Sequence, residues 1–152
     1  MPAVKRGVRF GIDVGEARVG VAVCDPDGLV ATPLTTLARD RSPAPGAVPS
    51  DLAELARLVA EYGTVEVVVG LPRTLAGAEG QQAARAREYA DQLAPVIAPV
   101  PVTMTDERMS TVVATRRLSE RGVRGRRQRK VIDQVAAAEI LQGWLDARRR
   151  QT

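Results

Sequence analysis

The chain has 152 residues, of which 45% are hydrophobic and 26% are charged, and its net charge is +4. This length and composition predict one globular domain, residues 1–152, with a core of its own. The absence of histidine excludes Ser-His and Cys-His nucleophile systems, histidine-ligated zinc and histidine acid–base chemistry. The single cysteine, Cys24, excludes an intrachain disulfide, and 3% aromatic residues are too few for base stacking to drive nucleic-acid binding. We recognise no signal peptide and no apolar run long enough for a membrane span, so we expect a cytoplasmic protein with no membrane partner.

The first part of the chain predicts an antiparallel meander of three strands. Apolar residues alternate with Arg, Gly and Asp between Val8 and Gly15, which is the two-residue period of a strand. Residues 17–24 form a second apolar run, and Asp25-Pro26-Asp27-Gly28 is a strong turn signal. Residues 29–37 then return as the third strand.

The rest of the chain alternates helices with strands after a proline-rich loop over residues 38–50. We expect this loop to be a plain linker, and the alternative is a functional flap. The next predicted element is a helix over 51–62, with Ser50 as N-cap and Gly63 at C′. A strand over 65–71, a helix over 79–93 and a strand over 100–105 follow it. The chain then continues with a helix from 110 or 111 to 121, a basic loop over 122–129 and a helix over 130–148. This order predicts an α/β fold with one five-stranded mixed sheet, in which three antiparallel strands are followed by two parallel strands and helices flank the sheet.

Two acids lie in segments that are predicted to be buried. Asp13 is inside the first strand, where Gly11 and Gly15 remove side chains on either side of it. A lone carboxylate in a sheet is costly to bury, so this pattern indicates a place that another backbone, a metal ion or a phosphate approaches. The alternative is an acid that caps the turn after the strand. Asp133 lies on the buried stripe of the last predicted helix, so it either binds a metal or pairs with a cation such as Lys130.

Asp106 and Glu107 follow the last predicted strand, at the edge where open α/β sheets place their sites. Adjacent residues of an extended chain point to opposite sides, so one of the two acids can face Asp13, and the pattern does not choose which. The alternative is that both are loop acids that pair with Arg108. Three carboxylates without histidine suit one or two Mg²⁺ or Mn²⁺ ions, with water as the nucleophile.

Basic charge is concentrated immediately before Asp133. Residues 116–130 contain eight cations and one acid. Contact with a phosphate backbone requires such a concentration, and the alternative is a solvated basic loop between two helices. The candidates for contact with nucleic acid in this segment are Arg124, Arg126, Arg127 and Lys130.

Five motifs, taken together and in order, resemble the YqgF/RuvX family of bacterial RNase H-like proteins. They are GIDVG at 11–15, ARVGVAV at 17–23, VGLPRTLAG at 69–77, TDERMST at 105–111 and KVIDQVAAAEIL at 130–141. The resemblance covers nearly the whole chain. It implies an RNase H-like fold and an acidic triad of Asp13, Glu107 and Asp133, with Glu107 favoured over Asp106.

The resemblance also implies a substrate and partners. Arg18, Arg73 and Arg108 match basic positions of the motifs, and we expect them to contact substrate phosphates. The family implies maturation of the 5′ end of pre-16S rRNA in the cytoplasm, with the small ribosomal subunit as a partner. Family members with the RuvX name point instead to branched DNA, whose symmetric cleavage would call for a homodimer rather than a monomer.

These observations leave competing hypotheses. The first is a metal-dependent endonuclease that acts on structured RNA, and the second is a Holliday-junction resolvase that acts on branched DNA. The third is a non-enzymatic RNA- or ribosome-binding module on the same fold, with structural acids. A phosphotransferase of the actin and sugar-kinase type also begins with a Gly-x-Asp-x-Gly strand, but it needs two such domains, and 152 residues are too few.

Overall fold

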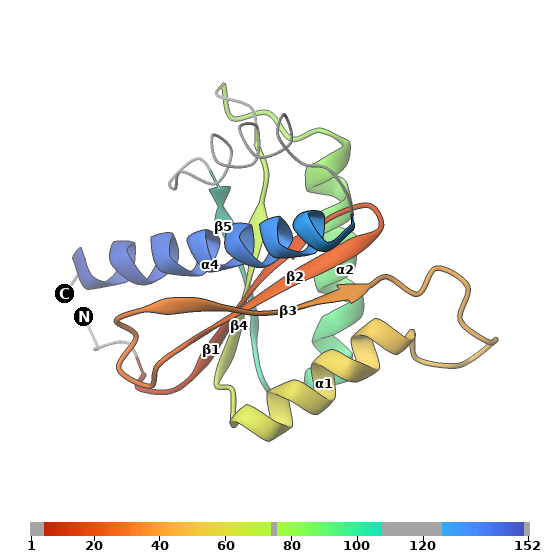
Figure 1. The fold of residues 1–152 in the computed structure, drawn as a ribbon, viewed down its shortest axis with the longest axis horizontal. Helices are drawn as coiled ribbons and strands as arrows, with labels where there is room; N and C mark the ends of the chain where they lie inside the picture. Colours follow the sequence, from red (N-terminus) through yellow and green to blue (C-terminus); the bar gives the residue numbers. More distant parts are fainter. Residues whose placement is uncertain (1–4, 74–75, 108–125, 151–152) are drawn as a thin grey trace.

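The computed structural model describes residues 5–73, 76–107 and 126–150, and it contains one five-stranded sheet. Its elements are β1 (Arg9–Val14), β2 (Arg18–Cys24), β3 (Ala31–Ala38), α1 (Ser50–Tyr62), β4 (Glu66–Leu71), α2 (Gln81–Ile97), β5 (Val102–Asp106) and α4 (Arg126–Arg150). The strand order is β3-β2-β1-β4-β5, in which β2 is antiparallel to both β1 and β3, β4 is parallel to β1, and β5 is parallel to β4. The predicted α/β fold, with a meander followed by two parallel strands, is confirmed (Figure 1).

The sheet separates α4 from α1 and α2 (Figure 1). Alternate residues of its strands face these two sides. Phe10 and Ile12 pack with buried residues of α1 and α2. Gly11, which lies between them, faces α4, because a Cβ on this glycine would lie 2.6 Å from the Cβ of Leu141. The two-residue period of a strand therefore places Asp13 on the α4 side of the sheet.

Helix α1 begins one residue earlier than predicted. Ser50 is its first residue and Pro49 is the N-cap, with no side-chain hydrogen bond, so the predicted Ser50 cap is wrong. The amide N–H of Ser50 instead donates to the carboxylate of Asp40 at 3.0 Å. The prediction for the other end is confirmed, because Gly63 has a φ of 60°, in the left-handed region that glycine adopts most easily.

Helix α2 continues for a further turn beyond the predicted end at residue 93, in spite of the proline in that turn. Ile97 is 5% exposed and extends the buried stripe that Ala90 and Leu93 form. Pro95 lacks an amide N–H, so the helix loses one hydrogen bond near its end. The burial of another large apolar side chain offsets that loss and sets the true end of the helix.

Helix α4 begins at Arg126, so the predicted basic loop over 122–129 is wrong for residues 126–129. Arg, Gln and Lys are good helix formers, and these four residues contain no glycine or proline that would break a helix. The high density of basic residues led to the prediction of a loop where the helix had already begun. The predicted helix that ends at residue 121 lies outside the described residues.

The predicted turn over residues 25–28 is confirmed. The N–H of Gly28 donates to the carbonyl oxygen of Asp25 at 2.9 Å, and Gly28 has a φ of 69°. The carboxylate of Asp25 accepts the amide N–H of Val30 at 2.7 Å and that of Leu29 at 3.1 Å. The hydrogen bond from Val30 is the main reason why the pKa of Asp25 is lower than usual.

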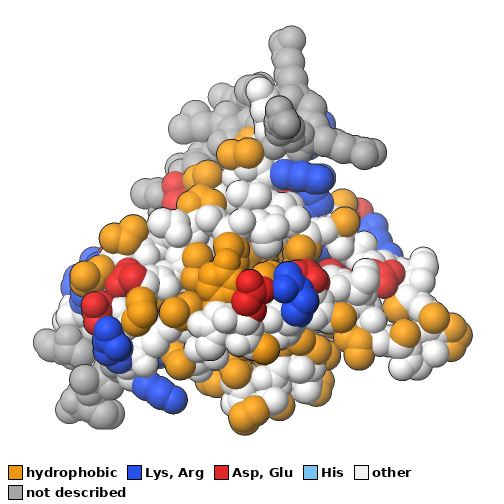
Figure 2. Space-filling model, turned by 60° about the horizontal axis from the view of Figure 1, so that its bottom comes forward, with side chains coloured by type: hydrophobic (Ala, Val, Ile, Leu, Met, Phe, Trp, Pro, Cys, Tyr) orange, Lys and Arg blue, Asp and Glu red, His pale blue; other side chains and the backbone are white. Residues whose placement is uncertain are grey.

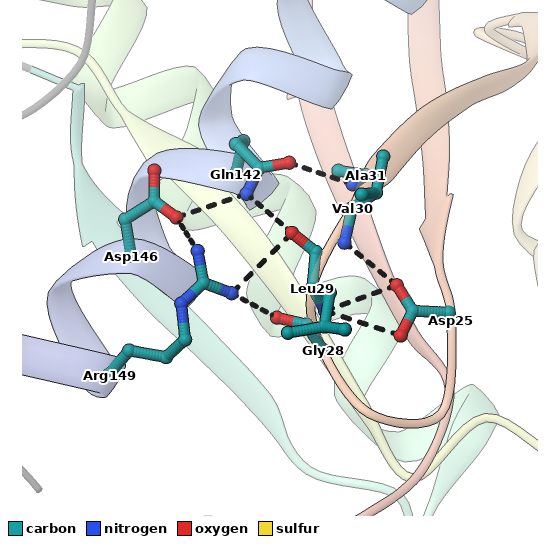
Figure 3. A network of polar contacts seen from close by, with 8 residues as sticks. All are labelled: Asp25, Gly28, Leu29, Val30, Ala31, Gln142, Asp146 and Arg149. Atoms are coloured by element: carbon teal, nitrogen blue, oxygen red, sulfur yellow. Dashed lines mark hydrogen bonds and ion pairs between the residues drawn. The ribbon is translucent and has the colours of Figure 1, made fainter.

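The C-terminal half of α4 is tied to this turn (Figure 3). The side-chain carbonyl of Gln142 accepts the N–H of Ala31 at 2.8 Å, and its amide group donates to the carbonyl oxygen of Leu29 at 3.0 Å. Arg149 donates to the carbonyl oxygen of Gly28 at 2.6 Å. These hydrogen bonds fix the C-terminal half of α4 against the β2–β3 turn and the start of β3.

Charged side chains of both signs are interspersed on the face shown in Figure 2, and hydrophobic side chains gather near its centre. Among the described residues, the large hydrophobic side chains with the greatest exposure are Leu29, Val30, Val48, Tyr62 and Val131. They come from the β2–β3 turn, the proline-rich loop, α1 and α4. Within the described ranges we find no helix whose length and apolar character would let it span a bilayer.

Candidate active site

Asp13 lies inside the sheet with a glycine on each side. All of β1 is buried, and Asp13 is 5% exposed. On one side Asp13 pairs with Gly20 of β2. On the other side Ile12 pairs with Val69 of β4, so the next residue, Gly70, lies beside Asp13. Because neither glycine has a side chain, groups from other elements come close to this part of the sheet.

Helix α4 uses the first of these glycines to approach the sheet. A Cβ on Gly20 would lie 2.0 Å from the carbonyl oxygen of Asp133 and 3.1 Å from its Cβ. Residues that pair directly across an antiparallel ladder face the same side, so Asp13 and Gly20 both face α4. The backbone of α4 at Asp133 therefore packs directly against the strand that neighbours Asp13.

Glu107 occupies the space over the second glycine. It follows β5 directly and is 2% exposed. A Cβ on Gly70 would lie 2.8 Å from Oε1 of Glu107 and 2.6 Å from Cδ1 of Ile140 in α4. Glu107 is thus on the α4 side of the sheet, which brings acids from β1, from the end of β5 and from α4 to one region.

Asp133 forms an ion pair with Arg18. The Nε of Arg18 donates to Oδ2 of Asp133 at 2.8 Å, and 28% and 22% of the two side chains, respectively, are exposed. Arg18 precedes Gly20 by two residues on β2, so the two residues share the face toward α4. Asp133 thus pairs with a cation, as one of the two alternatives predicted, but this cation is Arg18 of β2 and not the suggested Lys130.

Arg73 lies beside the other acid at the end of β5. Its guanidinium is 3.8 Å from Oδ2 of Asp106 and 3.4 Å from Oε2 of Glu79. Hydrogen bonds from Arg87 hold the pKa of Glu79 below its usual value, so Glu79 stays ionised next to Arg73 at neutral pH. Asp106 and Glu107 therefore differ in their surroundings: Asp106 faces a cation, and Glu107 lies over Gly70.

Comparison with known proteins assigns this chain to a family. Residues 7–147 match the family model described as "RuvX: Holliday junction resolvase". The chain belongs to the RuvX family. A relative from Mycolicibacterium paratuberculosis is 56% identical over 147 residues, which cover 97% of this chain and 84% of the relative. Another from Mycobacterium sp. (strain KMS) is 57% identical over 146 residues, which cover 95% and 82%. Both are named "Putative pre-16S rRNA nuclease".

The fold of this RuvX family member is shared with RuvC from Thermus thermophilus. The structure of RuvC in complex with a Holliday junction substrate matches with a TM-score of 0.59, covering 94% of this chain and 96% of RuvC. A second RuvC structure matches with a TM-score of 0.54. Both matches have 19% sequence identity, so they show the fold alone. The predicted RNase H-like fold is therefore confirmed.

The three acids of this RuvX chain have the donor chemistry of a Mg²⁺ or Mn²⁺ site, because hard cations prefer carboxylate oxygens. The glycine beside Glu107 also fits, because a Cβ on Gly70 would fill the space next to this carboxylate. Among the described residues, however, no three acids are grouped closely enough to hold an ion together. Since Asp133 faces Arg18, binding of one ion by all three acids would require Asp133 to change its partner.

The basic residues predicted to contact nucleic acid divide into three sets. Arg18 lies beside Asp133 of the candidate site, and Arg73 lies beside Asp106, the residue before Glu107. The backbone of Arg126 and Arg127 forms the first turn of α4, and Lys130 follows one turn later. Arg108 and Arg124 lie outside the described residues. Contact between nucleic acid and most of the basic segment therefore stays a prediction that the structure does not test.

Sequence reasoning missed the roles of Gly20 and Gly70. It placed emphasis on Gly11 and Gly15, which neighbour Asp13 along its own strand. The structure shows that the glycines that neighbour Asp13 across the sheet admit Asp133 and Glu107. A glycine inside an apolar strand pattern signals close approach of another backbone, and both segments carried that signal.

Proposed function

We propose that this RuvX family member is a metal-dependent endonuclease that processes the 5′ end of pre-16S rRNA, with residues 1–152 as a single nuclease domain. The observation that carries the proposal is that Asp13, Glu107 and Asp133 lie on the same side of the sheet, next to Gly20 and Gly70. The names of relatives with 56% and 57% identity support the choice of substrate. This activity belongs in the cytoplasm, with the small ribosomal subunit as a partner.

In the proposed mechanism Asp13, Glu107 and Asp133 would hold one or two Mg²⁺ or Mn²⁺ ions. Such ions supply activation of a water and stabilisation of the leaving oxygen. Asp13 and Glu107 are almost completely buried, so their carboxylates attract a divalent cation more strongly than exposed acids would. Arg73 follows the end of β4 and orients a substrate phosphate through charge-assisted hydrogen bonds.

A second candidate is a resolvase that acts on branched DNA, because the description of the matching family model names a Holliday junction resolvase. Symmetric cleavage of a four-way junction needs two active sites, so this candidate predicts a homodimer. The proposed action on rRNA needs one active site and is compatible with a monomer. The two candidates can therefore be told apart both by substrate and by oligomeric state: a homodimer that cleaves branched DNA, or a protein that cleaves rRNA and can act as a monomer.

The deciding experiment is a side-by-side cleavage assay with Asp13→Asn. The wild type and the variant are incubated with an end-labelled pre-16S 5′ leader and with a four-way DNA junction, each with Mg²⁺, Mn²⁺ or EDTA. We expect metal-dependent cleavage of the RNA, which falls about 100-fold or more in the variant because an amide is a poor ligand for these ions. Binding of the RNA, measured by filter retention, should change little, since Asp13 is buried and contacts no phosphate in this scheme.

Asp91→Asn is the matched control, because it makes the same chemical change on an exposed position of α2. Its cleavage rate should equal that of the wild type. If Asp13→Asn cleaves at the wild-type rate, the proposed mechanism is wrong. Cleavage of the junction alone would establish the second candidate, and tight RNA binding without any cleavage would establish the binding module.

A further inference from the structure

Asp133 differs from the other two acids in its exposure and in its partner. Its side chain is 22% exposed, whereas Asp13 and Glu107 are 5% and 2% exposed as residues. The Nε of Arg18 donates to its Oδ2 at 2.8 Å. Asp133 is therefore the acid that a cation from solvent reaches most easily, and one of its oxygens is already in contact with a positive charge.

The backbone on both sides of this ion pair is fixed by packing. Arg18 pairs with Ala38 of β3, and its carbonyl oxygen accepts the N–H of Gly15 at 2.8 Å. The carbonyl of Asp133 lies directly over Gly20. Any change of partner at Asp133 must therefore come from rotation of side chains, and the long, partly exposed side chain of Arg18 has the freedom to rotate.

A guanidinium and a divalent cation compete for the same carboxylate, because they repel each other and both need its oxygens. An ion pair between partly exposed groups contributes little free energy, so a divalent ion can replace the guanidinium at small cost. The released guanidinium then needs a new anion, and phosphate matches its planar array of donors.

We propose that Arg18 is a positioning residue that holds Asp133 toward the site in the ion-free protein, leaves it when a divalent ion binds, and then binds a substrate phosphate. The proposal rests on the metal site of the proposed function and deepens it, because it links ion binding to capture of the substrate. It assigns Arg18 two anionic partners in succession, first Asp133 and then a phosphate.

The test measures Mn²⁺ binding to the full chain without nucleic acid, from the electron paramagnetic resonance signal of free Mn²⁺. Arg18→Gln and Arg18→Met remove the competing charge, so the Kd for Mn²⁺ should fall about fivefold, the factor that a partly exposed ion pair is worth. Arg18→Lys keeps the charge and should stay within about twofold of the wild type. Using two neutral side chains of different shape guards against a single variant that fails to fold, and far-ultraviolet circular dichroism checks each one.

Arg41→Gln is the matched control, because Arg41 lies in the loop after β3 and pairs with Glu16 at 3.9 Å, not with an acid of the site. This control should leave the Kd for Mn²⁺ unchanged. If both neutral variants of Arg18 bind Mn²⁺ with an unchanged or weaker affinity, Arg18 is merely structural and the inference is overturned. An equal tightening by Arg41→Gln would reveal a general charge effect and would also overturn it.

Failure of the proposed function gives a different result in the same titration. If the wild type and the Arg18 variants bind no Mn²⁺, or if Asp13→Asn binds it as tightly as the wild type, the metal site itself is wrong. If Asp13→Asn loses Mn²⁺ and the neutral Arg18 variants do not gain affinity, the metal site stands and only the exchange at Arg18 is wrong.

Discussion

At Gly20 the backbone of α4 comes against the backbone of β2 and leaves no room for a side chain. A Cβ there would lie 2.0 Å from the carbonyl oxygen of Asp133 and 2.4 Å from its carbonyl carbon. Because both obstacles are backbone atoms, a side chain at this position would have to move the helix rather than a rotamer. The residue at position 20 therefore sets how closely Asp133 approaches the strand that carries Asp13.

Gly20→Ala should destabilise the protein by about 3 kcal/mol, the upper part of the range for overpacking, and should also lower cleavage because α4 shifts. Gly80→Ala is the control, since a Cβ on Gly80 would have nothing within 4 Å. Gly80 is the N-cap of α2, so this change should cost less than about 1 kcal/mol. Urea unfolding followed by circular dichroism measures both values. Equal stability of the two variants would show that the backbone contact at Gly20 is not rigid.

At the scale of residues, the sequence indicated which acids belong to the candidate site better than it indicated which residues pair with them. The alternation along β1 and the apolar stripe of the last helix depend on neighbouring residues, so Asp13 and Asp133 were recognisable as acids that face the interior, although the side chain of Asp133 is 22% exposed. The partner of Asp133 is Arg18, which is 115 positions away in the chain, and no local pattern connects the two. Lys130 was the nearest cation on the same helix, and proximity in sequence was a poor guide.

At the scale of elements, a buried acid connects the proline-rich loop over residues 38–50 to both helices on its side of the sheet. Asp51 of α1 accepts the N–H of Asp40 at 3.1 Å and the hydroxyl of Tyr89 in α2 at 2.7 Å. The guanidinium of Arg39 lies 5.2 Å from the centre of the Tyr89 ring. The start of the loop, which was expected to be a plain linker, is thus held against α1 and α2.

Tyr89→Phe should lower stability at pH 8 by about 1–3 kcal/mol, because it removes a buried hydrogen bond to a carboxylate. Burial, and then the hydrogen bond to Asp51, raise the pKa of Tyr89 above its ordinary value. A raised pKa means that the folded protein keeps the proton, so this stabilisation is complete below about pH 10 and decreases as the pH rises further, by about 1.4 kcal/mol per unit.

The difference in stability between the wild type and Tyr89→Phe should therefore shrink between pH 9 and pH 11, as urea unfolding at several pH values would show. Titration of all other groups is common to both proteins and cancels in the difference. A constant difference over this range would mean that Tyr89 titrates in the fold as it does in the unfolded chain.

Periodicity predicted the type of each described helix and strand, and it predicted the ends of the helices less well. The apolar repeat identifies residues that face the core, whereas the end of a helix depends on contacts made elsewhere. The start of α1 is supported by Asp40, ten residues before Ser50, and the end of α2 by the burial of Ile97. The first residues of α4 are all polar, so no apolar repeat marked them as helix.

At the scale of the whole molecule, one buried cation joins the N-terminal strand to the C-terminal helix. The Nε of Arg9 donates to Glu66 of β4 at 2.9 Å, and its guanidinium lies 5.4 Å from the centre of the Trp144 ring in α4. Arg9 also donates to the carbonyl oxygen of Lys5 at 2.6 Å. The guanidinium of Arg148 lies over the same ring, 4.7 Å from its centre.

The order of strands and helices was enough to predict the topology of the sheet, because short connections between successive elements allow few arrangements. It gave no sign of the cluster at Arg9, which combines residues from both ends of the chain. The alternating pattern of the first strand did not indicate the burial of Arg9, which is 3% exposed because α4 covers the side of the sheet to which it points.

Arg9→Met should destabilise the protein by about 3 kcal/mol, because it leaves Glu66, whose side chain is 16% exposed, without its cation. Arg148→Met removes the other guanidinium from Trp144 and should cost less than about 1 kcal/mol, since cation–π contacts at partly exposed sites are weak. Trp144 is the only tryptophan, so its fluorescence during urea unfolding reports the docking of α4 directly in both variants. Coincident fluorescence and circular-dichroism transitions would show that the helix and the sheet unfold together. Equal losses in the two variants would assign the stabilisation to the aromatic contact and not to the buried ion pair.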